Sequence, residues 1–356
     1  MRSLSPSHRA VLTLIPPELY TVRRLAIQPA PEGYSSTRQP TASPGDWSGL
    51  DTTQGGVQRH YHGGALATTK LPTSCPGLPC RCGYVVEDLS VAEHDPKYGA
   101  TFTLPFDYDP ESASRCNKWL EFLISTWGSE PDFDQRVMAL QEMFAATLFG
   151  IAPAYQRAFL LFGKAATGKT QILRVLRAML PPDATAELGP QYWGMQFHLP
   201  ALIGKTANIC GELPESGMIA GSMFKEVVEG APVTDSFKGK DRFTFTPKCA
   251  HWFASNYLPA SRDSSRGFTR RWLILDFNHP VAEKDQVKNL AETIVAEERE
   301  AIAAWAIGGL RRLLEQNSYT IPACHEKRSG QMRRILPAKC SNGADPMPKS
   351  CRPCGS

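Results

Sequence analysis

Apolar residues recur at helical or strand spacing only in the middle of this 356-residue chain. Residues 1–83 contain few periodic apolar segments and are crowded with Pro, Gly, Ser and Thr, so we expect a disordered or remnant leader. Beyond Pro322 the periodicity is lost again, which predicts a disordered tail over 323–356. Between these ends we expect a helical lead-in region at 84–150, a core at 151–282 and a C-terminal helical segment at 283–322.

Helical spacing is clearest on the two sides of the core. The segments 117–127 and 134–149 each carry an amphipathic stripe of aromatic and aliphatic residues, so each is expected to be a helix that packs against the core. The segment 283–314 is helical in pattern as well, with Gly308-Gly309 expected to interrupt it. We interpret the aromatic residues of these stripes as core residues rather than as a binding surface.

The core alternates short apolar runs with helical patterns. Strands are expected in the apolar runs at 159–162, 207–210, 249–256 and 272–275, and helices at 171–180 and 223–230. Pro181-Pro182 ends the first of these helices, and Gly230 ends the second. This pattern predicts an α/β fold with a parallel-type sheet flanked by helices.

The most specific motif lies between the first strand and the first helix of the core. Residues 163–170 fit the pattern G-x-x-x-x-G-K-[ST] at every fixed position, in the strand–loop–helix context that a phosphate-binding loop (P-loop) requires. Backbone N–H groups and the helix N-terminus would hold phosphate oxygens, Lys169 would reach the β- and γ-phosphates, and the Thr170 hydroxyl would ligate Mg²⁺. The candidate nucleotide-binding residues are therefore Gly163, Lys164, Ala165, Ala166, Thr167, Gly168, Lys169 and Thr170. The alternative is a glycine-rich turn before an ordinary helix.

An acidic residue follows the strand expected at 207–210. Glu212 stands about 40 positions after the P-loop, where a nucleoside triphosphatase needs a carboxylate to hold Mg²⁺ or to polarise the attacking water. Gly211 precedes it, so one carboxylate would do both tasks unless Glu215 contributes. A surface loop that happens to be acidic is the other interpretation.

Two further features would complete such a site. Asn256 ends the strand expected at 249–256 and would sense the γ-phosphate, although a turn-forming Asn is the simpler interpretation. Arg270 and Arg271 precede the strand expected at 272–275 and are candidates for an arginine finger that acts on the nucleotide of a neighbouring subunit. Alternatively, they are surface charges that flank a strand.

A basic hairpin is expected between these features. The strand-like segments 233–237 and 242–246 flank Lys238-Gly239-Lys240-Asp241, which brings three cations, Lys238, Lys240 and Arg242, close together. They are candidate contacts to the phosphates of a DNA strand. An ordinary solvated hairpin remains the alternative.

The composition is that of a globular protein, but it does not identify the function. The hydrophobic fraction of 42% is that of a globular protein, and the net charge of +4 is compatible with nucleic-acid binding but does not indicate it. No run of 18 apolar residues and no secretory signal is present, so we expect a cytoplasmic protein with reduced thiols. Two cysteine groups, at 75–82 and 340–354, lack a full set of zinc ligands at the usual spacing.

In this order, the motifs resemble those of the phage, plasmid and poxvirus primase-associated helicases of superfamily three. The resemblance covers about residues 85 to 322. Besides the P-loop, it rests on the following segments: His94 to Tyr98, Leu104 to Pro110, Trp119 to Leu123, Lys225 to Gly230, Phe245 to Lys248, Asn256 to Pro259, Arg270-Arg271, Asp276-Phe277, Glu298 to Ile302 and Trp305 to Leu310. No single motif besides the P-loop is specific, but the ordered set is.

The resemblance implies an AAA+-like ATPase that assembles as a hexameric ring and moves along DNA as it hydrolyses ATP. Carried over by position, Lys169 and Thr170 hold phosphate and Mg²⁺, Glu212 is the acidic motif and Asn256 the sensor. Arg270 or Arg271 would be the finger, and the hairpin at Lys238 and Lys240 would contact DNA in the channel. Residues 1–80 do not resemble the primase domain that usually precedes this module, so the resemblance does not extend to priming.

Three functions are compatible with the sequence. The first is the DNA helicase module of a prophage primase-helicase, working as a homo-hexamer with ATP, Mg²⁺ and DNA. The second is a P-loop ATPase that remodels protein partners and does not grip DNA. The third is a truncated prophage remnant that folds but does not turn over.

Overall fold

A computed structural model describes residues 69–70, 82–85, 90–93, 104, 106 and 110–341 of the chain. The first three of these ranges are short strands, β1 (Thr69–Lys70), β2 (Cys82–Val85) and β3 (Ser90–Glu93), which form an antiparallel sheet in the order β1-β2-β3. The disorder expected over 1–83 is therefore wrong for the residues of β1 and for the first two of β2. The remainder of that leader lies outside the described residues.

A five-stranded parallel sheet organises the rest. Its strands are β4 (Ala158–Gly163), β5 (Thr185–Ala186), β6 (Ala207–Cys210), β10 (Ala250–Ser255) and β12 (Trp272–Phe277), in the spatial order β12-β4-β10-β6-β5. Every neighbouring pair is parallel; Phe159, for example, pairs with Trp252 on one side and with Leu273 on the other. β4 and β12 are nearly continuous apolar runs because both faces of a parallel sheet are covered.

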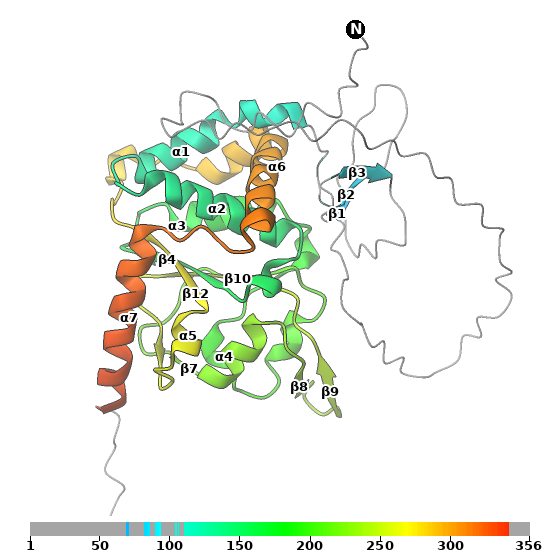
Figure 1. Ribbon diagram of the computed structural model, residues 1–356, viewed down its shortest axis with the longest axis vertical. Coiled ribbons are helices and arrows are strands. Elements are labelled where there is room, and N and C mark those ends of the chain that lie inside the picture. The colour runs from blue at the N-terminus through cyan, green and yellow to red at the C-terminus, as the bar shows by residue number, and fades with distance from the viewer. Residues whose placement is uncertain are drawn as a thin grey trace, which may run out of the picture.

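Alternate residues of β4, β6, β10 and β12 enter two different hydrophobic clusters. Phe159, Leu161, Trp252 and Leu273 belong to a cluster that includes the helices on one face, and Leu160 and its neighbours belong to a cluster on the other face. In Figure 1 the first group of helices (α1, α2, α3 and α6) lies above the sheet, and α4 and α5 lie below it. The fold is thus a mixed α/β fold with a parallel sheet between two layers, as expected.

The helices agree with the expected segments at most positions. The larger layer contains α1 (Asn117–Trp127), α2 (Phe133–Leu148), α3 (Lys169–Ala178) and α6 (Leu290–Gln316), and the smaller one contains α4 (Gly221–Val228) and α5 (Arg266–Thr269). Short 3-10 helices occur at Pro110–Arg115, Ala152–Tyr155, Pro182–Ala184, Pro190–Tyr192, Leu199–Leu202 and Glu283–Asp285. None of the helices in the described part of the chain is long and apolar enough to cross a membrane.

The expected break at Gly308-Gly309 is wrong, because α6 continues through both glycines. A Cβ atom on Gly309 would lie 2.6 Å from the backbone carbonyl carbon of Gln141 in α2. The glycine therefore allows α2 and α6 to approach closely, and Gln141 Nε2 donates a hydrogen bond to the Trp305 carbonyl at this contact. Close helix packing, rather than helix termination, accounts for the small residue.

Two smaller sheets adjoin the smaller layer, which contains α4 and α5. The parallel pair β7 (Met218–Ile219) and β11 (Ala260–Ser261) lies near α4. The antiparallel pair β8 (Val233–Ser236) and β9 (Arg242–Phe245) is the expected hairpin, and it projects from the lower end of the molecule (Figure 1).

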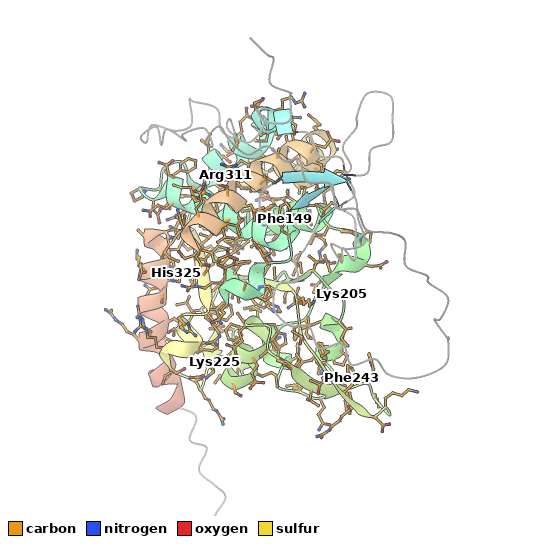
Figure 2. The ribbon with its side chains drawn as sticks, turned by 45° about the vertical axis from the view of Figure 1, so that its right-hand side comes forward. Phe149, Lys205, Lys225, Phe243, Arg311 and His325 are labelled. Carbon is orange, nitrogen blue, oxygen red and sulfur yellow. The ribbon has the colours of Figure 1, made fainter. Side chains whose placement is uncertain are left out.

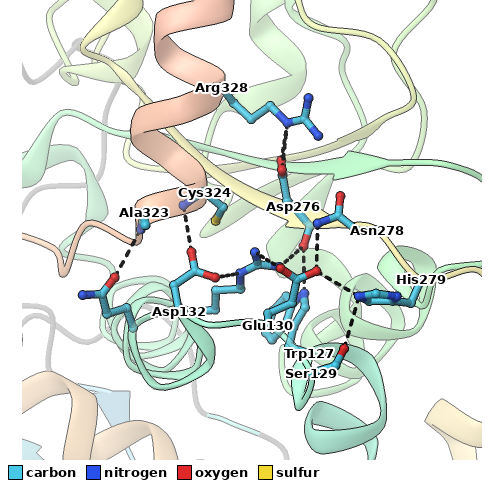
Figure 3. Close-up of polar contacts among 12 residues, drawn as sticks. Trp127, Ser129, Glu130, Asp132, Asp276, Asn278, His279, Ala323, Cys324 and Arg328 are labelled. Carbon is cyan, nitrogen blue, oxygen red and sulfur yellow. Dashed lines mark hydrogen bonds and ion pairs between the residues drawn. The ribbon is translucent and has the colours of Figure 1, made fainter.

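The largest difference from the sequence expectation is α7 (Ala323–Ser341), which occupies residues expected to be disordered. α7 covers the outer edge of β12, where His325 Nδ1 accepts a hydrogen bond from Ile274 N and Arg328 Nε donates to both carboxylate oxygens of Asp276 at 2.8 Å. At its start, Cys324 N donates to Asp132 at the N-terminus of α2 (Figure 3). These three contacts are polar, so apolar periodicity could not reveal them. The remaining tail, 342–356, lies outside the described residues.

His325 of α7 is expected to make the stability of the fold dependent on pH. Its ring is 5% exposed, and burial, together with the charges of Arg157 and Arg333, lowers its pKa from 6.5 to about 4. Between these values the unfolded chain binds a proton that the folded protein does not, so stability falls as the pH falls. We expect a loss of about 2 kcal/mol between pH 7 and pH 4.5 from this residue.

The variant His325→Asn tests this expectation. The Asn side-chain oxygen can accept the hydrogen bond from Ile274 N, but the amide does not bind a proton in this pH range. Urea unfolding across this pH range should give a shallower decline for the variant than for the wild-type chain. Part of the decline should remain, because burial lowers the pKa of His251 to about 3. Parallel pH profiles for the two proteins would contradict the assignment to His325.

Candidate functional site

A cavity of about 720 Å³ opens at the carboxyl ends of three neighbouring strands, β4, β10 and β6. Ligands of open α/β sheets bind at this edge. The P-loop begins at Gly163, the last residue of β4, Asn256 directly follows β10, and Glu212 is the second residue after β6, so parallel pairing brings them together. The expected site residues that line the cavity are Ala165, Ala166, Thr167, Gly168, Lys169, Thr170, Glu212 and Asn256.

The P-loop needs its two fixed glycines for different reasons. Gly163 has φ +153°, and a Cβ atom there would lie 2.0 Å from the carbonyl oxygen of Phe277 on β12. Gly168 has φ +92° and precedes α3, where a side chain would also press on the Phe122 ring. The first residues of α3, Lys169 and Thr170, therefore face the cavity with the N-terminus of the helix.

Lys169 lies across the loop from Asn256. Its Nζ donates hydrogen bonds to the carbonyl oxygens of Gly163 (2.7 Å) and Lys164 (2.5 Å), and to Asn256 Oδ1 at 3.2 Å. The side chain is buried, at 8% exposure, and burial lowers the pKa of its ammonium group, whereas the charge of Glu212 raises it. A buried cation whose hydrogen-bond partners are neutral oxygens is suited to an anionic ligand.

The acidic residues differ in position. Glu212 is exposed to the cavity, and its loop is fixed by a hydrogen bond from Leu213 N to the carbonyl of Ala254 on β10. Glu215 is exposed and does not belong to the cavity lining. Of these two glutamates, only Glu212 lines the cavity; Asp285 of the segment after β12 lines it as well.

One side of the cavity was not anticipated from the motifs. It is formed by α1, through Phe122, Ser125 and Thr126, and by the segment after β12, through His279, Val281 and Val287. This segment is joined to the P-loop by a hydrogen bond from Val281 N to the Ala166 carbonyl (2.8 Å). Val287 is 62% exposed although it is apolar. Only Phe122 belongs to a segment of the family resemblance, and its place in an apolar stripe predicts a core residue; the positions come together only when α1 packs beside the P-loop.

The two candidate arginine fingers, Arg270 and Arg271, occupy different environments. Neither lines the cavity of its own chain. Arg271 is buried: its guanidinium pairs with Glu229 and donates to the Gly267 carbonyl at 2.7 Å. Arg270 is exposed, with a 3.4 Å contact to Gln156 Oε1. Of the two, only Arg270 is free to reach a neighbouring subunit without breaking a buried ion pair.

The basic hairpin lies apart from the cavity. Lys238 and Lys240 occupy its five-residue tip, Arg242 begins β9, and all three are exposed. Phe243 of the same strand stacks on Phe237, which is 52% exposed (ring centroids 5.4 Å apart), and Figure 2 shows Phe243 at this end of the molecule. Cations and exposed aromatic faces therefore alternate on one small surface.

The four cysteines whose side chains the structure describes are not part of a metal centre. Cys116, Cys210, Cys249 and Cys324 are buried free thiols, and the described residues contain no group of three or more His, Cys, Asp or Glu placed to hold a metal ion. The cysteines at 75, 80, 351 and 354 lie outside the described residues, as do the side chains of Cys82 and Cys340.

The family model that matches this chain covers only part of it. Residues 161–271 match the model of a family of unknown function, DUF5906. No curated protein matches the chain.

Among solved structures, the A form of the apo C-terminal region of NrS-1 is similar, with 15% identity and a TM-score of 0.42 over 54% of this chain and 44% of that one. A second apo structure of this region has 14% identity and the same TM-score. A crystal structure of JCV helicase has 14% identity and a TM-score of 0.31 over 63% of this chain and 67% of that one. The chain thus spans less than half of the NrS-1 region that it matches.

Proposed function

We propose that this chain is the ATP-dependent DNA helicase module of a phage- or plasmid-type replication protein, and that it works as a ring, with a homo-hexamer as the expected assembly. The observation that carries the proposal is the convergence of the P-loop, Glu212 and Asn256 on one cavity at the carboxyl ends of β4, β6 and β10. Nucleotide hydrolysis needs a phosphate cradle, a carboxylate and a polar sensor within reach of one another.

The residues of the cavity fit a nucleoside triphosphate with Mg²⁺. Lys169 is a buried cation held by neutral oxygens, and the N-terminus of α3 faces the same space. The Thr170 hydroxyl and the Glu212 carboxylate are hard oxygen ligands of the kind that Mg²⁺ prefers. When bound between these two residues and the nucleotide, Mg²⁺ would offset the negative charge of the phosphates.

The protein groups would then divide the work of hydrolysis. Lys169 would exchange its contact with Asn256 for the phosphates, which frees the Asn256 amide to orient a water molecule against the γ-phosphorus. Glu212 would accept a proton from that water as the new P–O bond forms and the bond to the ADP oxygen breaks. The charge that develops on the phosphoryl group still requires a further cation, for which the exposed Arg270 of an adjacent subunit is our candidate.

The hairpin provides the proposed contact to DNA. Lys238, Lys240 and Arg242 are exposed close to one another, as contacts to successive phosphates require. If they grip the strand during turnover, DNA should raise the rate of ATP hydrolysis, and the hairpin should be necessary for that increase.

The test is the rate of ATP hydrolysis with and without single-stranded DNA. We expect stimulation of the wild-type chain and little or none for Lys238→Ala/Lys240→Ala, with the DNA-free rate unchanged. Lys205→Ala/Lys327→Ala, which removes two lysines outside the hairpin and the cavity, is the matched control. Hydrolysis that does not respond to DNA in the wild-type chain would contradict the helicase and favour an ATPase that acts on protein partners.

A further inference from the structure

Asp276, near the carboxyl end of β12, is a buried carboxylate beside the strand that carries the P-loop. It pairs with Phe162 of β4, and the next pair along, Phe277 with Gly163, contains the first residue of the loop. The side chain of Asp276 is 3% exposed. Burial raises the pKa of its carboxyl group, whereas the hydrogen bonds and the charge of Arg328 lower it. A carboxylate so buried requires a paired cation.

Arg328 of α7 is that cation, and it contacts both strands at once. Its Nε donates to the two carboxylate oxygens of Asp276, each at 2.8 Å (Figure 3). The guanidinium carbon lies 4.6 Å from the centroid of the Phe162 ring, which is a cation–π contact. Nη1 donates to Gln331 Oε1, three residues later in α7, at 2.8 Å. Arg328 therefore ties the residue of β4 that precedes the P-loop to its neighbour on β12.

The backbone of Asp276 is held by the larger helical layer. Its carbonyl oxygen accepts hydrogen bonds from Trp127 Nε1 in α1 (2.8 Å) and from Arg136 Nη1 in α2 (2.9 Å). Three helices thus fix this residue, α1 and α2 through its carbonyl group and α7 through its side chain. The contact from α7 also extends to β4, because Arg328 lies against Phe162.

The start of the P-loop depends on the spacing between these two strand ends. A Cβ atom on Gly163 would lie 2.0 Å from the Phe277 carbonyl oxygen, so the two backbones approach each other with no side chain between them. The Gly163 carbonyl in turn accepts the hydrogen bond from Lys169 Nζ at 2.7 Å. A displacement of the end of β12 would therefore reach the Gly163 carbonyl and the ammonium group that is bonded to it.

We propose that Arg328 is a positioning residue for ATP hydrolysis, which acts on the P-loop through Asp276 and Phe162. The inference rests on the proposed function in that the cavity must hydrolyse ATP. It makes α7 a part of the catalytic unit, although no residue of α7 lines the cavity. If Arg328 served only to anchor α7, its loss would lower the stability of the fold but leave the P-loop unchanged.

The experiment measures hydrogen exchange of the 163–170 segment in the nucleotide-free protein, together with steady-state kcat and KM for ATP. Arg328→Ala should raise the exchange rate of the P-loop amides about tenfold, because the loop opens more often. It should lower kcat about ten- to a hundredfold, the cost of a small displacement of an aligned group. KM should change much less than kcat, since alignment in the transition state is lost rather than binding.

His325→Ala is the matched control. It removes another polar contact of α7 to β12, the hydrogen bond from Ile274 N, but leaves the pair of Arg328 with Asp276 intact. This variant should be less stable to urea, with the P-loop exchange and the kcat of the wild-type chain.

Two further variants separate the pair from the helix. Arg328→Lys keeps a cation beside Asp276 and Phe162, so it should recover most of the wild-type kcat. A double-mutant cycle of Arg328→Ala with Asp276→Asn should be non-additive in kcat, because the two residues act as one pair. If Arg328→Ala does not fold, Arg328→Gln takes its place, since its amide can donate to Asp276 but carries no charge.

A folded Arg328→Ala protein with the P-loop exchange and the kcat of His325→Ala would show that Arg328 only anchors α7. An Arg328→Lys protein as slow as Arg328→Ala would also contradict the inference, because the cation is retained. Lys169→Ala separates this inference from the proposed function. If Lys169→Ala is inactive and Arg328→Ala is fully active, the inference alone fails, whereas hydrolysis by Lys169→Ala at the wild-type rate would contradict the proposed function.

Discussion

Replacement of Lys169 by Ala is expected to lower the rate of ATP hydrolysis at least about a hundredfold. Among the described residues that line the cavity, Lys169 supplies the only Lys or Arg side chain, and it is buried where a cation has most effect on phosphate charge. Loss of one preorganised electrostatic contact to a reacting group typically costs two to three orders of magnitude, on the order of 100- to 1,000-fold. The measurement is steady-state phosphate release at saturating ATP and Mg²⁺.

The fold should survive this change. Lys169 itself lines the cavity and donates to the backbone carbonyls of Gly163 and Lys164, so water from the cavity can replace its ammonium group there. Urea unfolding of Lys169→Ala should confirm this, with Lys205→Ala as the control for loss of a lysine elsewhere. A folded Lys169→Ala protein that hydrolyses ATP at the wild-type rate would show that the cavity is not the catalytic site.

Arg271→Ala is expected to destabilise the protein by about 2–3 kcal/mol, whereas Arg270→Ala should change its stability by less than about 0.5 kcal/mol. The side chain of Arg271 is 7% exposed, and its removal leaves Glu229, itself 31% exposed, without its cation. Arg270 has no comparable buried contact. Urea denaturation of both variants measures the difference, and equal stabilities would contradict the structural role of Arg271.

The same two arginines differ in their expected effect on catalysis. If Arg270 acts on the nucleotide of the next subunit, Arg270→Ala should lower hydrolysis about a thousandfold or more while the fold is unchanged. Mixing Arg270→Ala with Lys169→Ala should then restore activity, because an intact P-loop of the first would meet an intact Arg270 of the second. A mixture no more active than its two components would exclude Arg270 as a finger in trans.

The parts of the fold that depend on neighbouring residues could be predicted from the sequence. The apolar stripe of α1 predicts its bounds at 117 and 127, and the glycine pattern of 163–170 predicts a loop between strand and helix. Glu212 and Asn256 could be placed at strand ends, and the parallel order of β4, β10 and β6 then brings them to the same cavity.

The features that depend on distant partners could not be predicted. α7 docks through His325 and Arg328 onto β12, so its contacts follow no apolar period. Arg271 is buried because Glu229, 42 positions earlier, faces it, and sequence alone could not separate it from Arg270. Likewise, Phe197 in the connection between β5 and β6 has φ +71° and donates its N–H to Asp235, which lies 38 positions later in the chain.

The central claim is that the cavity between the ends of β4, β6 and β10 binds the triphosphate of ATP. The most direct measurement is a crystal structure of the chain with a non-hydrolysable ATP analogue and Mg²⁺. Our account predicts phosphate oxygens on the backbone amides of 165–170 and on Lys169 Nζ, with Mg²⁺ on the Thr170 hydroxyl. An analogue bound elsewhere, or a P-loop that closes on Asn256 and excludes it, would contradict the account.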